Sequence, residues 1–128
     1  MSIEERIQEE LALLSGKHPG LEVAPDGRWV KVPAYPLPRG WNRATTDVAF
    51  RIVDPPAGPY GIYVPGGLLF NGQRPNNYSE PAAGVPFAGT WGVFSWTPET
   101  WTPGTTAKSG SNYFNWVGSF GARFREGV

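Results

Sequence analysis

Proline and glycine limit the length of every regular element that this chain can form. The sequence holds 14 prolines and 17 glycines among 128 residues, about a quarter of the chain. Proline lacks a backbone N–H and glycine loses the most conformational freedom on folding, so both interrupt helices and strands. Aromatic residues make up 14% of the chain, and this much large apolar surface is typical of a folded domain rather than a disordered one. The composition therefore predicts a folded domain that is rich in loops.

The first segment predicts an amphipathic helix over residues 1–16. Ser2 and Glu5 have the spacing of a capping box, in which each side chain satisfies a backbone N–H at the start of a helix. Four aliphatic residues then recur at helical spacing: Ile3, Ile7, Leu11 and Leu14. Gly16 is expected to end the helix, and Pro19 prevents its continuation.

The next stretches predict a meander of three or four antiparallel strands. A Pro-Asp-Gly turn at 25–27 divides residues 21–32 into a hairpin. Residues 46–53 alternate between apolar and polar side chains, as a half-buried strand does, and residues 60–64 predict another short strand. The proline-rich segment 33–42 is expected to be a connection, because proline is not tolerated in a central strand.

Residues 65–90 are rich in glycine, proline and asparagine and show no periodicity. A stretch of this length inside a small domain is typical of a functional loop or of a disordered segment. Three aromatic residues offer it anchors: Phe70, Tyr78 and Phe87. An ordered loop is therefore expected, followed by a dense aromatic segment at residues 91–96.

A closing helix is predicted over residues 109–125. Large apolar residues recur there at helical spacing: Tyr113, Trp116, Val117, Phe120 and Phe124. Ser111 or Asn112 is suited to cap its first turn. Gly118 and Gly121 weaken the helix but would permit close packing against a neighbour.

Strands bracketed by helices predict an α+β fold, with residues 1–128 forming a single domain. The 11 basic and 11 acidic residues give a formal net charge of zero, which argues against nucleic acid and anionic membranes as partners. The chain has no cysteine and one histidine, so thiol chemistry, disulfides and a metal site built from clustered Cys and His are excluded. No cofactor is expected. The acidic start and the lack of a long apolar run favour a cytoplasmic protein.

Three further features have both a structural and a functional interpretation. His18 lies in a turn after the first helix and is expected to be exposed to solvent. The pairs Gly66-Gly67 and Asn71-Gly72 could bind an anion through backbone N–H groups, but turn chemistry explains them. Four aromatic residues follow: Trp91, Phe94, Trp96 and Trp101. They could form a stacking platform for a sugar or a base, and we expect them instead to form a corner of the core.

The segment 91–104, Trp-Gly-Val-Phe-Ser-Trp-Thr-Pro-Glu-Thr-Trp-Thr-Pro-Gly, resembles the bacterial family called prokaryotic E2 family E. Segments 35–42 and 60–65 share the resemblance, which covers about residues 30–125. Its sharpest part is an aromatic residue and Ser95 followed six residues later by Trp-x-Pro-Gly. The resemblance implies a ubiquitin-conjugating (E2/UBC-like) fold: an N-terminal helix, a four-stranded antiparallel meander, a long active-site loop at 65–104 and a C-terminal helix.

Members of this family accompany ubiquitin-like proteins, E1-like activating enzymes and deconjugating peptidases in bacterial operons, and the resemblance implies these partners here. In eukaryotic E2 enzymes a catalytic cysteine follows a His-Pro-Asn motif and precedes Trp-x-Pro. This chain has Trp101 and Pro103 in the last motif, with Trp91 upstream, but neither the cysteine nor His-Pro-Asn. Trp96-Thr97-Pro98 also stands where the family often has a basic residue and a histidine.

Ser95 lies near the position where the cysteine would fall, which makes it the candidate acyl carrier. A serine hydroxyl is far less acidic than a thiol, so it needs a base or strong support for the oxyanion. Glu99 is the nearest candidate base, and Glu80 could reach the site through the loop. Asn76 and Asn77 are the candidate oxyanion donors.

Three functions remain open at this point. The first is an E2-like transferase that carries the C-terminus of a ubiquitin-like protein as an oxyester on Ser95. The second is a non-catalytic E2-like adaptor that binds the E1-like enzyme or the ubiquitin-like protein. The third, from another class, is a small carbohydrate-binding or phage-type β module that uses exposed tryptophans.

Overall fold

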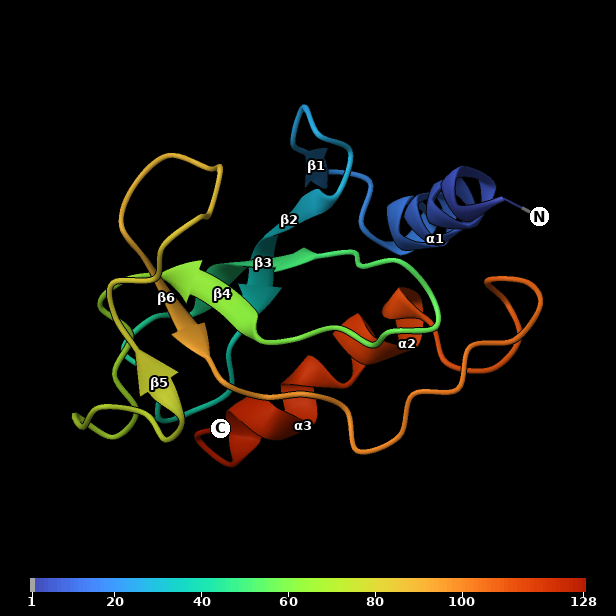
Figure 1. Ribbon diagram of the computed structural model, residues 1–128. Helices are drawn as coiled ribbons and strands as arrows, with labels where there is room; N and C mark the ends of the chain where they lie inside the picture. The colour runs from blue at the N-terminus through green and yellow to red at the C-terminus, as the bar shows by residue number, and fades with distance from the viewer. Residues whose placement is uncertain (1) are drawn as a thin grey trace.

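An N-terminal helix, an antiparallel sheet and two short C-terminal helices make up the computed structural model, which describes residues 2–128 (Figure 1). The elements in chain order are α1 (Ile3–Lys17), β1 (Glu22–Val23), β2 (Trp29–Pro36), β3 (Thr45–Arg51), β4 (Ile62–Pro65), β5 (Tyr78–Ser79), β6 (Trp91–Phe94), α2 (Tyr113–Gly118) and α3 (Phe120–Arg125). The predicted mixed α+β class, with a helix at each end of an antiparallel sheet, is confirmed.

The first helix forms where its apolar spacing predicts it. The Ser2 hydroxyl accepts a hydrogen bond from the Glu5 backbone N–H at 3.1 Å, as in a capping box. The helix ends at Lys17, and its predicted start at residue 1 lies outside the described residues. Ile3 is exposed, so the predicted apolar stripe is wrong there. His18 caps the last turn and is half-buried, which contradicts the expected full exposure.

The sheet has six strands among the described residues, in the order β1-β2-β3-β4-β6-β5, and all pairs are antiparallel. The predicted hairpin and the two strands after it are β1 to β4. The predicted active-site loop at 65–104 is not continuous, because β6 pairs with β4 along its whole length, from Ile62–Phe94 to Pro65–Trp91. Trp91, Gly92 and Phe94 are all buried, which hides the two-residue alternation that identifies a strand.

The prediction that the proline-rich segment is only a connection is wrong for its first part. Strand β2 continues through Pro33 to Pro36, with a register shift between Val32 and Tyr35 and with Ala34 at a φ of +54°. Strand β1 pairs only with Val30 and Lys31, so this end of β2 has a neighbour on one side alone. Proline is tolerated there because an edge position does not need its missing N–H.

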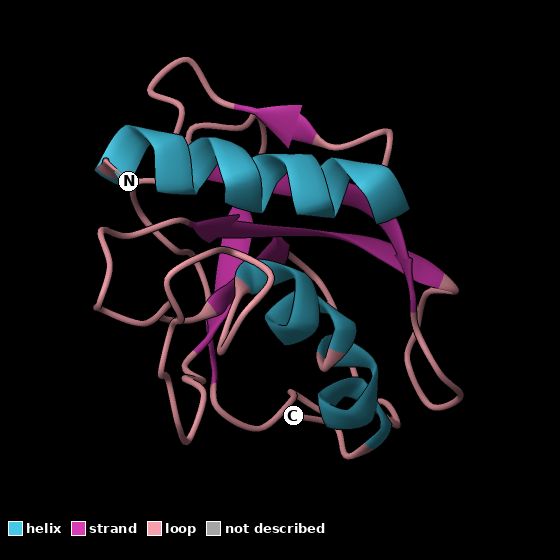
Figure 2. Cartoon of the chain, turned by 90° about the vertical axis from the view of Figure 1, so that its right-hand side faces the viewer, coloured by secondary structure: helices cyan, strands magenta, loops and turns pink. Residues whose placement is uncertain are grey.

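One hydrophobic core joins the helices to the sheet. Its fully buried members include Leu14 of α1, Phe50 of β3, Phe94 of β6 and Phe120 of α3. Figure 2 shows α1 lying along the sheet, with the α2–α3 pair beside it. The predicted closing helix begins at Tyr113 rather than at residue 109, because Asn112 is the N-cap of α2, and it breaks into two short helices at Ser119.

Candidate functional site

Ser95 is exposed and follows directly after β6. Its backbone N–H donates to the Asn77 carbonyl at 2.8 Å, which ties this position to the segment that leads into β5. Its hydroxyl lies 3.1 Å from the hydroxyl of Tyr60, which precedes β4. Three parts of the chain that are distant in sequence therefore meet at Ser95, and Tyr60 is the one that contacts its hydroxyl.

Tyr60 is a partner that the sequence reasoning did not identify. Its side chain is 55% exposed, so the serine–tyrosine pair is open to an incoming molecule. The next residue, Gly61, has a φ of +73° and donates its N–H to the Trp96 carbonyl at 2.9 Å. A Cβ there would lie 3.0 Å from a Val93 methyl group and 3.3 Å from the Phe94 carbonyl oxygen. Glycine is needed for this close approach, and the approach brings Tyr60 to Ser95.

The other nominated side chains make no hydrogen bond to Ser95 within residues 2–128. Glu99 and Asn76 are exposed, and neither side chain is hydrogen-bonded in that part of the chain. The Asn77 side chain donates to the Val128 carbonyl at 3.4 Å, and its backbone has a φ of +59°. Asn77 therefore contacts Ser95 through its backbone carbonyl and not through its side chain. Glu99, Asn76 and Asn77 are nominated from their positions in the sequence, and such positions do not determine where a side chain points.

The Glu80 carboxylate accepts hydrogen bonds from residues of its own loop. Its Oε1 accepts hydrogen bonds from the Tyr78 hydroxyl at 2.6 Å and from the Gly67 N–H at 2.9 Å. These two bonds hold the pKa of Glu80 below its usual value. Burial, followed by the neighbouring carboxylate, raises the pKa of Tyr78. The backbone that could have bound a foreign anion at Gly66-Gly67 thus binds the carboxylate of Glu80.

The Trp-x-Pro-Gly motif, residues 101–104, packs against α2 and is hydrogen-bonded to α1. The Trp101 ring meets Tyr113 edge-on at 5.3 Å between centroids, and a Cβ at Gly58 would lie 2.9 Å from it. Pro103 forms an isolated bridge with Gly110. The carbonyl of the following residue, Gly104, accepts a hydrogen bond from Arg6 Nη1 at 2.7 Å. The motif therefore fastens the segment after Ser95 to the first helix.

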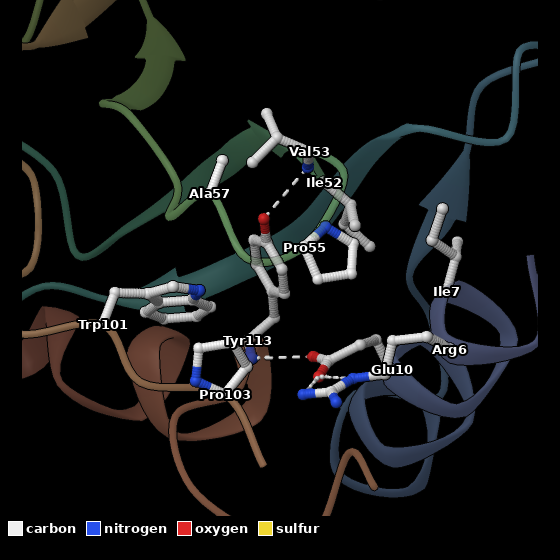
Figure 3. Close-up of a pocket in the computed structure, with 10 residues that line it drawn as sticks. All are labelled: Arg6, Ile7, Glu10, Ile52, Val53, Pro55, Ala57, Trp101, Pro103 and Tyr113. Atoms are coloured by element: carbon white, nitrogen blue, oxygen red, sulfur yellow. Dashed lines mark hydrogen bonds and ion pairs between the residues drawn. The ribbon is translucent and has the colours of Figure 1, made fainter. Parts of the chain in front are cut away.

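A small cavity beside this motif is lined by residues of α1, of the segment that follows β3, of the motif itself and of α2 (Figure 3). Glu10 Oε2 accepts a hydrogen bond from the Tyr113 N–H at 2.8 Å, and Glu10 Oε1 accepts one from Arg6 Nε at 3.3 Å. Burial is the largest influence on Glu10 and raises its pKa, although the Tyr113 N–H and Arg6 oppose the shift. The cavity measures about 10 Å³, room for one water at most. The cavity is therefore too small for a substrate, and the residues around it hold α1 against α2.

The aromatic residues around Ser95 belong to the core, as expected. Trp91 is buried, and its Nε1 donates to the carbonyls of Phe87 and Ala88 at 3.1 Å each. The half-buried Trp96 packs edge-on against Phe120 at 5.7 Å, with the Arg123 guanidinium 4.6 Å above its ring. No tryptophan in the described chain is among its exposed large apolar residues. This packing is what the expected corner of the core requires.

Neither a metal centre nor a membrane span is found in the described chain. No group of three His, Cys, Asp or Glu residues within 2–128 is placed to hold a metal ion. None of the helices described there is long and apolar enough to cross a bilayer. Comparison with known proteins finds no matching family model, curated protein or solved structure. The fold and the site thus define a mixed α+β domain with an open serine–tyrosine pair at one end of its sheet.

Proposed function

We propose that this chain is an E2-like protein of a bacterial ubiquitin-like conjugation pathway, and that Ser95 carries the C-terminal acyl group of the ubiquitin-like protein as an oxyester. The observation that carries the proposal is the exposed Ser95 hydroxyl with the Tyr60 hydroxyl 3.1 Å away. The order of helix, antiparallel sheet and closing helix supports it, because an E2-like domain has this order.

The transfer step uses atoms that this pair supplies. The Ser95 Oγ attacks the carbonyl carbon of the thioester between the ubiquitin-like protein and the E1-like enzyme. The oxygen–carbon bond forms, the carbon–sulfur bond breaks, and the E1-like enzyme regains its thiol. The Tyr60 hydroxyl accepts the serine proton and gives its own proton to the departing sulfur, so no further base is consumed.

A second function, that of an E2-like adaptor, is favoured by one specific observation. Within residues 2–128 no carboxylate or imidazole is hydrogen-bonded to Ser95, whereas activated serine nucleophiles usually have such a partner. As an adaptor, the domain binds the E1-like enzyme or the ubiquitin-like protein without forming a bond.

Replacing Ser95 separates the two functions. The protein is mixed with the E1-like enzyme, the ubiquitin-like protein and ATP, and its intact mass is measured. The transferase forms one adduct that resists thiol reductant and yields to hydroxylamine, because it is an oxyester. Ser95→Ala abolishes the adduct, and Ser95→Cys makes it sensitive to reductant.

Ser79→Ala is the matched control, because Ser79 is an exposed serine on the neighbouring strand β5. This variant is expected to form the adduct as the wild-type protein does. An adduct that survives Ser95→Ala would show that another residue is the acyl carrier. Stable binding of a partner with no adduct from the wild-type protein would select the adaptor.

A further inference from the structure

An open hollow lies elsewhere in the fold, and neither Ser95 nor Tyr60 lines it. It measures about 440 Å³ and is formed by the end of α1, the proline-rich end of β2 and the α2–α3 pair. This volume is within the range of ligand pockets in proteins. The hollow is therefore large enough for a few residues of a peptide.

Helices α2 and α3 contribute Arg125 and two helical glycines, Gly118 and Gly121, to the lining. Neither has a positive φ, so the backbone conformation does not require glycine. A Cβ at Gly118 would meet nothing within 4 Å, and one at Gly121 would meet only Arg125 Nη1 at 3.9 Å. The expected close packing at these glycines is therefore wrong. Glycine destabilises a helix relative to alanine, and what the two glycines provide here is open space.

The charged groups around the hollow are all basic. Lys17 ends α1 and Arg125 ends α3, and no Asp or Glu lines the hollow. Within the described chain, neither Lys17 nor Arg125 takes part in an ion pair. The chain as a whole has no net charge, so this is a local positive potential rather than a general one. Such a rim attracts anionic groups.

Residues 35–38 give the hollow an apolar wall. Tyr35 donates its hydroxyl to the Val117 carbonyl at 2.7 Å, which holds its ring against α2. Leu37 and the prolines at 36 and 38 continue this wall, and proline offers no backbone N–H. A ligand that fits both surfaces carries carboxylates for the rim and an apolar side chain for the wall.

We propose that this hollow binds a short acidic peptide segment of a partner protein, with its carboxylates at Lys17 and Arg125 and an apolar side chain against Tyr35 and Leu37. The open surface at Gly118 and Gly121 admits the peptide backbone. A free inorganic anion would leave most of the volume and the whole apolar wall unused. The proposal does not depend on the chemistry of Ser95.

The test uses a labelled synthetic peptide of glutamates around one central leucine and measures fluorescence anisotropy. Saturable binding is expected, weaker at high salt because the rim contacts are ionic. Gly118→Leu is expected to weaken binding at least about tenfold because the side chain fills the hollow, and to raise the thermal midpoint because leucine favours a helix. Lys17→Ala with Arg125→Ala is expected to weaken binding by about tenfold.

Two control variants keep the test specific. Gly16→Leu also replaces a helical glycine with open space around it, but Gly16 does not line the hollow, so binding stays unchanged. Lys108→Ala removes an exposed cation elsewhere, again without effect. The proposal is overturned if Gly118→Leu binds as the wild type does, if a glutamine version of the peptide binds equally well, or if no saturable binding occurs. Full displacement of the peptide by a low concentration of inorganic phosphate would overturn it in favour of a small-anion site.

Discussion

At the scale of single residues, the environment of Ser95 depends on a neighbour 35 positions earlier in the chain. The sequence pattern identifies Ser95 because it lies in a recognisable motif. It does not identify Tyr60, because that contact depends on Gly61 allowing the start of β4 to approach the end of β6. Glu99 is only four residues from Ser95, yet its side chain makes no hydrogen bond to it. Spacing along the chain identifies the candidate nucleophile, whereas its neighbour Tyr60 is identified only by a tertiary contact.

Tyr60→Phe removes the hydroxyl and keeps the ring. If the phenol relays the proton of Ser95, the variant forms the oxyester adduct at least about tenfold more slowly, since positioned proton transfer contributes about 10² or more to a rate. The rate is followed by intact mass at fixed concentrations of the E1-like enzyme and the ubiquitin-like protein. Tyr63→Phe is the control, because Tyr63 packs edge-on against Trp29 and makes no hydrogen bond to Ser95. Equal rates in the wild-type protein and Tyr60→Phe would exclude the relay.

At the scale of elements, α2 illustrates how a short helix depends on its cap. It has six residues, fewer than an isolated helix needs to be stable. The buried Asn112 accepts a hydrogen bond from the Asn115 N–H and donates one to the Ala107 carbonyl, both at 2.7 Å. The cap therefore both starts the helix and holds the loop before it.

Asn112→Ala is expected to lower the free energy of unfolding by about 2–3 kcal/mol, because it removes the cap and leaves a buried carbonyl without its partner. Ser2→Ala removes the exposed cap of α1 and is expected to cost about 1 kcal/mol or less. Denaturant titrations of both variants give the comparison. A cost at Asn112 no greater than that at Ser2 would show that solvent replaces the lost hydrogen bonds.

The elements that the sequence predicts correctly are those with their own periodicity or cap. Helix α1 shows a long apolar stripe, and β3 alternates over its length, so both are found close to their observed bounds. Strand β6 is missed because both of its faces are buried and its four residues are too few to show a period. The proline-rich half of β2 is missed because only the pairing pattern reveals that it lies at an edge.

At the scale of the whole molecule, a few hydrogen bonds join the first helix to a segment about a hundred residues later. Glu10 accepts from the Tyr113 N–H, Glu9 accepts from the Ala107 N–H at 2.9 Å, and Arg6 donates to the Gly104 carbonyl. The equal numbers of acidic and basic residues leave little overall charge repulsion. The response of stability to pH therefore depends on individual carboxyl groups, and Glu10 is the most buried of them.

The raised pKa of Glu10 predicts the sign of one pH effect. The folded state holds this proton more tightly than the unfolded chain, so the contribution of Glu10 to stability is full below about pH 4.5 and falls as pH rises through its folded pKa. The wild-type protein should therefore lose stability relative to Glu10→Gln as the pH rises above about 4.5, as measured by denaturant titration at each pH. Glu80 and Asp26, whose pKa values are lowered, act in the opposite direction but are present in both proteins.

Gln8→Ala, on the exposed face of the same helix, should follow the wild-type curve. If the wild-type protein instead gains stability relative to Glu10→Gln as pH rises, then Arg6 and the Tyr113 N–H outweigh burial and Glu10 is held as a carboxylate.

The strands at the borders of the sheet bear on how this molecule behaves beside copies of itself. The outermost strands, β1 and β5, have two residues each, and the uncovered end of β2 carries Pro33, Pro36 and a bulge. An exposed strand with free N–H and C=O groups is a template on which another chain can add, which is how fibrous aggregates begin. In this sheet, β1 and β5 are too short to pair with a strand of another chain, and the uncovered end of β2 has too few N–H donors. The prolines that limit regular structure within the chain also oppose strand pairing between chains.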